Sequence, residues 1–74
     1  MTEKILIQAQ YWGFTTRLDD QGKWQVLPKS ETEEWILEEI EDRWLLIINN
    51  VPQVNLTDDQ ALCFLKRIYW ASFD

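Results

Sequence analysis

The sequence predicts a single α+β domain over residues 1–74: an antiparallel meander of about four to six short strands with one C-terminal α-helix packed on a face. Three observations predict it. Extended runs rich in β-branched and aromatic residues alternate with turn residues between positions 14 and 56. The segment from Thr57 to Tyr69 carries apolar residues at helical spacing. Apolar residues make up 46% of the chain, including five tryptophans, which indicates a folded globule rather than a disordered segment.

Residues 4–11 alternate between apolar and polar side chains, and this period of two predicts a first strand. Gly13 interrupts the run and indicates a bulge or a bend. The expected apolar side of this strand carries Ile5, Ile7, Ala9 and Tyr11, and the polar side carries Gln8, Gln10 and Trp12.

Residues 14–27 predict a β-hairpin. The segment 14–18 continues in extended conformation, and the turn cluster 19–22 includes Gly22, which accepts a positive φ. Residues 23–27 return as the next strand, which ends at Pro28.

Residues 30–48 support two interpretations. As a helix, the segment begins with the capping box 30–33 and repeats apolar residues at spacings of three and four. As a hairpin turning at residues 41–42, it places alternate residues from Trp35 to Ile48 on one face. We favour the hairpin because the five consecutive apolar residues 44–48 suit a strand buried on both faces, although residues 41–42 lack the Asn-Gly or Asp-Gly of a favoured tight turn.

The last third of the chain predicts a turn, an edge strand and a helix. Asn49-Asn50 tolerates the left-handed conformation of a turn, and Pro52 restricts residues 51–56 to a sheet edge because it cannot donate a ladder hydrogen bond. Residues 57–60 form a capping box with two acids at the positive end of the helix dipole. The apolar stripe of this helix is expected to contain Ala61, Leu62, Leu65, Ile68 and Tyr69.

Residues 42–52, followed by residues 57–61, resemble a pattern in short uncharacterised cyanobacterial proteins. Those proteins carry no assigned activity, so the resemblance implies no role for any residue here. It implies a bacterial, cytoplasmic origin.

The charge balance disfavours several classes of partner. A formal charge of −6 repels the phosphate backbone, so nucleic-acid binding is not expected. No apolar run approaches the ~20 residues that span a bilayer, so no membrane contact is expected either. Residues 1–5 do not begin a secretory signal, and Cys63 is the single cysteine, which together predict a reducing cytoplasm.

The chain offers little for catalysis or for a cofactor. It has no histidine, the usual general base near neutral pH. Cys63 lies next to the apolar stripe of the expected helix, where a thiol is generally an inert packing group. A turn and a helix cap account for the adjacent acids at 19–20 and 58–59. We therefore expect no enzyme activity, no catalytic residue, no cofactor and no metal site.

Two surface features are candidates for contact with another protein. Trp12, Trp70 and Phe73 are expected at the surface, because so small a core hides few tryptophans and exposed aromatics are enriched at interfaces. The alternative for Trp70 is that it folds over the sheet and caps the core. The acidic run between residues 31 and 42 is either a solvated face or a docking surface. Its candidate contact residues are Glu34, Glu38 and Glu39.

These observations favour a small non-catalytic protein–protein interaction module, whose partner is another protein or a second copy in a homodimer. Exposed aromatics beside an acidic surface would make the contact. An acidic inhibitor, or a mimic of nucleic acid that blocks a basic surface, is the alternative. An enzyme that uses carboxylates is the third and weakest hypothesis.

Overall fold

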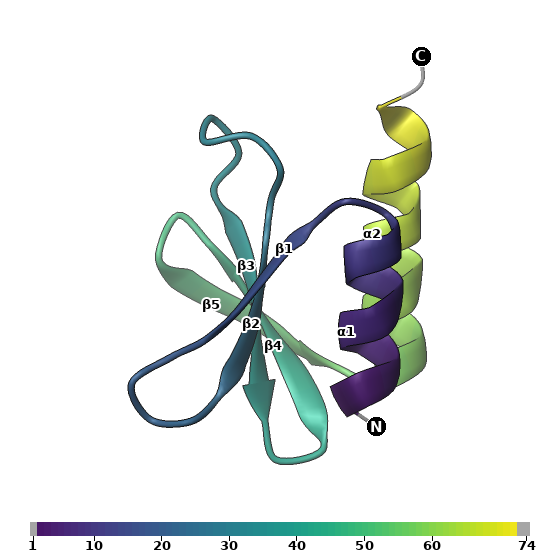
Figure 1. Ribbon diagram of the computed structural model, residues 1–74. Coiled ribbons are helices and arrows are strands. Elements are labelled where there is room, and N and C mark those ends of the chain that lie inside the picture. The colour runs from purple at the N-terminus through teal and green to yellow at the C-terminus, as the bar shows by residue number, and fades with distance from the viewer. Residues whose placement is uncertain (1, 73–74) are drawn as a thin grey trace.

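In the computed structural model, which describes residues 2–72, two helices lie on one face of a five-stranded antiparallel sheet (Figure 1). The strands follow one another in chain order, so the predicted α+β meander with a C-terminal helix is confirmed. The elements are α1 (Thr2–Tyr11), β1 (Thr15–Leu18), β2 (Trp24–Leu27), β3 (Trp35–Ile40), β4 (Arg43–Ile48), β5 (Val51–Leu56) and α2 (Asp58–Ala71).

The strand predicted over residues 4–11 is wrong, because these residues form helix α1. Ile5, Leu6 and Ala9 are buried, and their spacing of one and four residues places them on one side of a helix. Ile7 and Tyr11, which a strand would put beside Ile5, are 69% and 80% exposed. Burial against the sheet and α2 therefore follows the helical period, and the alternation in the sequence is coincidental.

Gly13 ends α1 and does not form the bulge or bend expected in a strand. It has φ of 89°. Its N–H donates to the carbonyl of Gln10 at 3.0 Å, and the N–H of Phe14 donates to the carbonyl of Ala9 at 2.9 Å. This pair of hydrogen bonds is the Schellman motif, in which glycine takes the left-handed position after the last helical turn.

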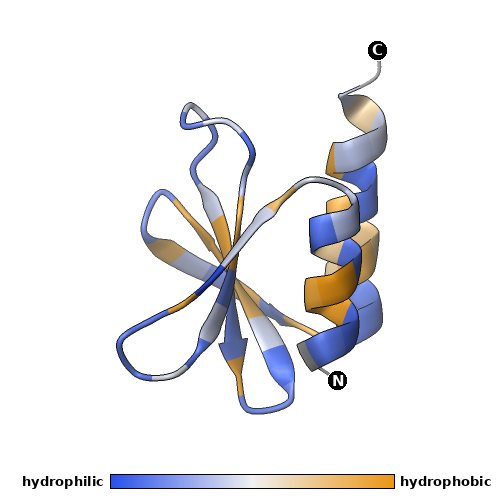
Figure 2. Cartoon of the chain, in the orientation of Figure 1, coloured by the Kyte–Doolittle hydropathy of each residue, from blue (hydrophilic) through white to orange (hydrophobic). Residues whose placement is uncertain are grey.

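The hairpin predicted within residues 30–48 is confirmed, since β3 and β4 pair from Trp35↔Ile48 to Ile40↔Arg43. Glu41 supplies the positive φ of 55° that the two-residue turn needs, although its side chain does not favour that conformation. In the next turn Asn49 and Asn50 both have positive φ, as a type I′ turn requires. Figure 2 shows that the turns are hydrophilic and that the apolar residues gather in the strands and on the helices.

The helices cover only one face of the sheet, so the expectation that residues 44–48 are buried on both faces is wrong. Trp44 points toward the helices and is 1% exposed. Leu45 and Ile47, on the opposite face, are half-buried, and Ile48 at the end of β4 is exposed. The core lies between the sheet and the helices, and its buried members are Ile5, Leu6, Ala9, Phe14, Val26, Trp35, Leu37, Trp44, Ala61 and Leu65.

The predicted capping box begins α2, where the hydroxyl of Thr57 accepts from the N–H of Gln60 at 3.2 Å and the Gln60 side chain accepts from the N–H of Thr57 at 2.9 Å. The helices α1 and α2 run side by side in the same direction (Figure 1). Lys4 and Asp59 meet at their beginnings, with 3.8 Å between Nζ and Oδ1. The rings of Trp12 and Tyr69 stack at the other end of the pair.

Asp19 closes the β1–β2 turn and gives it a pH-dependent stability. Backbone N–H groups of Lys23 at 2.8 Å and of Gln21 at 2.9 Å donate to its Oδ1, and these bonds lower the pKa of the Asp19 carboxyl. The stabilisation is therefore complete above the unfolded-state pKa of about 4, and it is lost as the pH falls through the lower folded-state pKa.

We expect Asp19→Asn to unfold more easily than the native chain at pH 7, with the difference shrinking as the pH falls below about 4. Urea denaturation at several pH values measures it, and Asp20→Asn in the same turn controls for the loss of one charge. A difference that persists unchanged at low pH contradicts this role for the Asp19 carboxylate.

Candidate interaction surface

An aromatic cluster lies at the end of the helix pair and includes two of the predicted contact residues. Trp12 follows α1, is half-buried and stacks on Tyr69 with 5.5 Å between ring centroids, so its expected place on the polar side of a strand is wrong. Trp70 is 58% exposed and meets Tyr69 edge-on at 5.8 Å. The third predicted aromatic, Phe73, lies outside the described residues.

The loop between β2 and β3 lies against this end of α2. The ammonium of Lys29 sits 5.2 Å from the ring centroid of Phe14 and 5.1 Å from that of Tyr69, which are cation–π distances. Glu33 from the same loop helps to line a pocket of about 400 Å³ with Ile68 and other residues of α2. Acidic loop residues therefore border the end of α2 that carries Trp70.

The three predicted acidic contacts lie apart. Glu34 is exposed in the loop before β3. Glu38 faces away from the helices, because its neighbours across the sheet are Gln25 and Leu45. Glu39 points to the helix side, and its Oε1 accepts from the backbone N–H of Trp24 at 3.2 Å. The acidic run follows the whole of β3, roughly 20 Å for a six-residue strand, and so does not form one patch.

An apolar shelf, which we define as Ile48, Val51 and Val54, extends from the core beyond α2. The register places all three on the helix side of the sheet, since Ile48 pairs with Trp35 and Val51, and Val54 pairs with Leu46. They are 39%, 55% and 48% exposed, so the helices leave them partly uncovered. Together they leave an uncovered apolar strip beside α2.

Two hollows lie beside α2 and share Phe64, and we call them together the α2–β5 groove. One part is a hollow of about 350 Å³, and the other, beyond Phe64, is a hollow of about 450 Å³ that includes Ile48 and Trp35. The first part is lined by Leu46, Leu56, Asp59, Gln60, Cys63, Phe64 and Arg67.

Sequence reasoning missed the shelf because of a bulge in β5. Residues three apart in a regular strand, such as Val51 and Val54, point to opposite faces. Here Val54 pairs with Leu46 while Pro52 pairs with Ile47, which leaves Gln53 as the extra residue. The bulge brings both valines to one face. Its only sequence signal is Pro52, which is common at edges and bulges.

Cys63 also differs from its predicted role. It was expected to pack inertly beside the apolar stripe of the helix, but the thiol is exposed on α2 and borders the α2–β5 groove. The buried residues of α2 are Ala61 and Leu65, so Cys63 lies on the opposite side of the helix.

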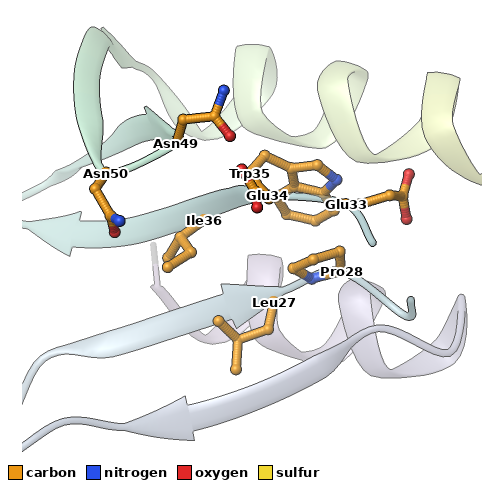
Figure 3. Close-up of a pocket in the computed structure, with 8 residues that line it drawn as sticks. All are labelled: Leu27, Pro28, Glu33, Glu34, Trp35, Ile36, Asn49 and Asn50. Atoms are coloured by element: carbon orange, nitrogen blue, oxygen red, sulfur yellow. The ribbon is translucent and has the colours of Figure 1, made fainter. Parts of the chain in front are cut away.

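A further hollow of about 320 Å³ opens beside the β4–β5 turn (Figure 3). In Figure 3 the ring of Trp35 lies between β3 and α2, whereas Ile36 lies on the other side of β3. Glu33, Glu34, Asn49 and Asn50 form its polar part. The Nε1 of Trp35 is a buried donor with no acceptor among residues 2–72.

The ionisable side chains of the described residues lie at or near the surface. None of the Asp, Glu, Lys or Arg side chains in residues 2–72 is buried, whereas a general acid needs a desolvated carboxyl. The same residues contain no group of three side chains able to hold a metal ion. No helix among them combines the length and apolar character needed to cross a bilayer.

No family model matches the chain, and neither the curated proteins nor the solved structures include a detectable relative. The functional argument therefore rests on the surface geometry of this chain.

Proposed function

We propose that the chain is a small, non-catalytic protein–protein interaction module that makes contact through exposed aromatic and apolar side chains next to acidic residues. The exposure of apolar side chains along α2 carries the proposal: Trp70 at its end is 58% exposed, and Val51 and Val54 beside it are 55% and 48% exposed. Large exposed apolar side chains gathered on one part of a small domain are typical of an interaction site.

The surroundings of Trp70 support a contact role for it. Its ring meets Tyr69 edge-on, and Tyr69 in turn stacks on the half-buried Trp12. A tryptophan held by other rings loses less side-chain entropy when a partner covers it, and tryptophan is enriched among residues that dominate binding energy. Glu33 and Glu34 in the nearby loop place negative charge beside this end of α2.

The proposal also includes a cytoplasmic setting and excludes nucleic acid and membranes as partners. A reducing compartment keeps an exposed cysteine such as Cys63 in its thiol form. The formal charge of −6 opposes binding to phosphate backbones and to anionic lipid surfaces.

The test is affinity capture from the cell that produces the protein, with retained proteins quantified by mass spectrometry. We expect Trp70→Ala to lose at least about 10-fold of the specifically retained protein, because a contact tryptophan commonly contributes 2 kcal/mol or more. The control Tyr11→Ala removes another exposed ring, 80% exposed on α1, and should retain the partner.

Raising the salt concentration separates this proposal from the acidic-mimic alternative. A contact made by aromatic and apolar groups should weaken only modestly in salt. If capture disappears in salt and on charge reversal at Glu34 and Glu38, while Trp70→Ala still binds, the acidic mimic is the better description. If no protein, including an untagged copy of the chain, is retained by the native form, the interaction module is refuted.

A further inference from the structure

We infer that the partner of the α2 surface is a second copy of this chain, in a two-fold dimer whose α2 helices pack antiparallel and cross at Cys63. The inference rests on the proposed function, since it names the partner of that surface. The charged and apolar side chains on the exposed side of α2 favour a second copy as this partner.

One exposed side of α2 carries Asp59, Cys63, Arg67 and Trp70. Their spacings of four, four and three residues place them in a line along the helix, and all four are exposed. Ala61 and Leu65 are buried on the opposite side. This line runs next to the α2–β5 groove, to whose lining Asp59, Cys63 and Arg67 contribute.

The charges along this line are self-complementary about Cys63. Asp59 lies four residues before it and Arg67 four residues after it, so the two charges are roughly 12 Å apart along the helix. A two-fold axis at Cys63 reverses the second helix and brings Asp59 of each copy opposite Arg67 of the other. The same patch then supplies both sides of the contact, as an isologous interface requires.

The groups needed for these pairs are available. Neither Lys66 nor Arg67 forms an ion pair with the part of the chain that the structure describes. Asp59 lies 3.8 Å from Lys4, but their side chains are 88% and 62% exposed. An exposed pair of this kind contributes little, so Asp59 can also face a second positive charge.

The antiparallel arrangement also covers the exposed ring of Trp70. Trp70 lies near the end of α2, so the antiparallel pair places its ring beside the beginning of the other copy's α2, which starts at Asp58. Leu56 lines the α2–β5 groove, and Val54 precedes it on the same side of the sheet. The ring would thus pack at the end of the other copy's groove where α2 begins, twice in each dimer.

Helix packing is favoured over strand addition at the β5 edge. Pro52 removes one ladder donor from that edge, and the bulge at Gln53 interrupts its regular spacing. A second copy is therefore less able to pair with the edge of β5 than to pack against α2.

A charge-exchange experiment tests the dimer by sedimentation velocity over a range of concentrations. The native chain should sediment as a dimer. Arg67→Glu and Asp59→Arg should each weaken self-association by at least about 10-fold, because each sets like charges opposite one another twice. An equimolar mixture of the two variants should regain the dimer, since each Asp59–Arg67 contact then joins opposite charges again. Circular dichroism of each variant checks the fold.

Cross-linking gives a second and independent readout. Cys63 is the only cysteine, so a short bismaleimide should convert the native chain to a covalent dimer in high yield. The control carries Cys63→Ser together with Asp20→Cys, an exposed position in the β1–β2 turn away from α2, and should cross-link poorly.

A native chain that stays monomeric at high concentration, or variants whose mixture fails to associate, overturns the dimer. Equal cross-linking at positions 63 and 20 overturns it as well. None of these results refutes the interaction module itself, which the capture experiment decides.

Discussion

Replacing Ile5 with alanine is expected to lower the free energy of unfolding by about 2–5 kcal/mol, whereas Ile7→Ala should change it by less than about 0.5 kcal/mol. Ile5 is 0% exposed in the core between α1 and the sheet, and Ile7 is 69% exposed on the outer side of the same helix. The substitutions are chemically identical and two residues apart. Their different effects therefore come from the helical conformation alone.

Urea denaturation of the two variants and the native chain measures this difference. In the strand that the sequence alternation suggests, both isoleucines lie on one face and should matter about equally. Similar losses for Ile5→Ala and Ile7→Ala would therefore contradict helix α1. The far-ultraviolet circular dichroism spectrum of the native chain should also show the helical content expected for α1 and α2 together.

Trp44→Ala is expected to cost about 3–5 kcal/mol, a large share of the stability of so small a domain. The ring is 1% exposed and lies where β4 faces the helices. Its Nε1 donates to Oδ1 of Asp58 at 3.1 Å, so it also ties the sheet to the first turn of α2. We expect the variant to unfold at a much lower urea concentration and to be partly unfolded in buffer.

A pair of milder substitutions separates the hydrogen bond from the packing. Trp44→Phe leaves Asp58 without this donor, whereas Trp35→Phe removes a buried Nε1 that has no acceptor among residues 2–72. Both lose ring volume in the core. We therefore expect Trp44→Phe to be less stable than Trp35→Phe by about 1–2 kcal/mol, measured by the same denaturation. The reverse order would show that packing, and not the hydrogen bond, dominates at position 44.

Local signals predicted most of the sheet. The turn residues 19–22 and Asn49-Asn50 lie at observed turns, and Pro52 is on the observed edge strand. The apolar run 44–48 correctly favoured a strand, although the reason was partly wrong, because only one face of the sheet is covered. Pairing of β3 with β4 over six residues stabilises the hairpin by more than the positive φ of Glu41 destabilises it.

Helix α1 is where local reasoning failed. Its sequence fits a period of two as well as a helical period, and propensity alone does not decide between them. The stop signal was present, since Gly13 takes the left-handed position of a Schellman motif, but a glycine after an apolar run is equally compatible with a strand bulge.

The candidate contact surface was predictable only in part. Trp70 is exposed, which agrees with the expectation that it lies at the surface and not with the alternative that it caps the core. Trp12, by contrast, is half-buried in a stack with Tyr69. The shelf and the α2–β5 groove depend on the bulge at Gln53 and on how far α2 reaches across the sheet. Both depend on how segments that are distant in the sequence pack together, and the periodicity of a single segment gives no information about that packing.

The sequence by itself determined the meander, the capped C-terminal helix and the negative charge, because turns, caps and charge depend on residues that are near one another in the chain. Tertiary structure alone decided that residues 2–11 are helical and that one side of α2 stays uncovered. The physical reason is burial: Ile5, Leu6 and Ala9 become helical because that conformation packs all three against the sheet and α2. The same packing places Asp59, Cys63, Arg67 and Trp70 in the exposed line on which the dimer depends.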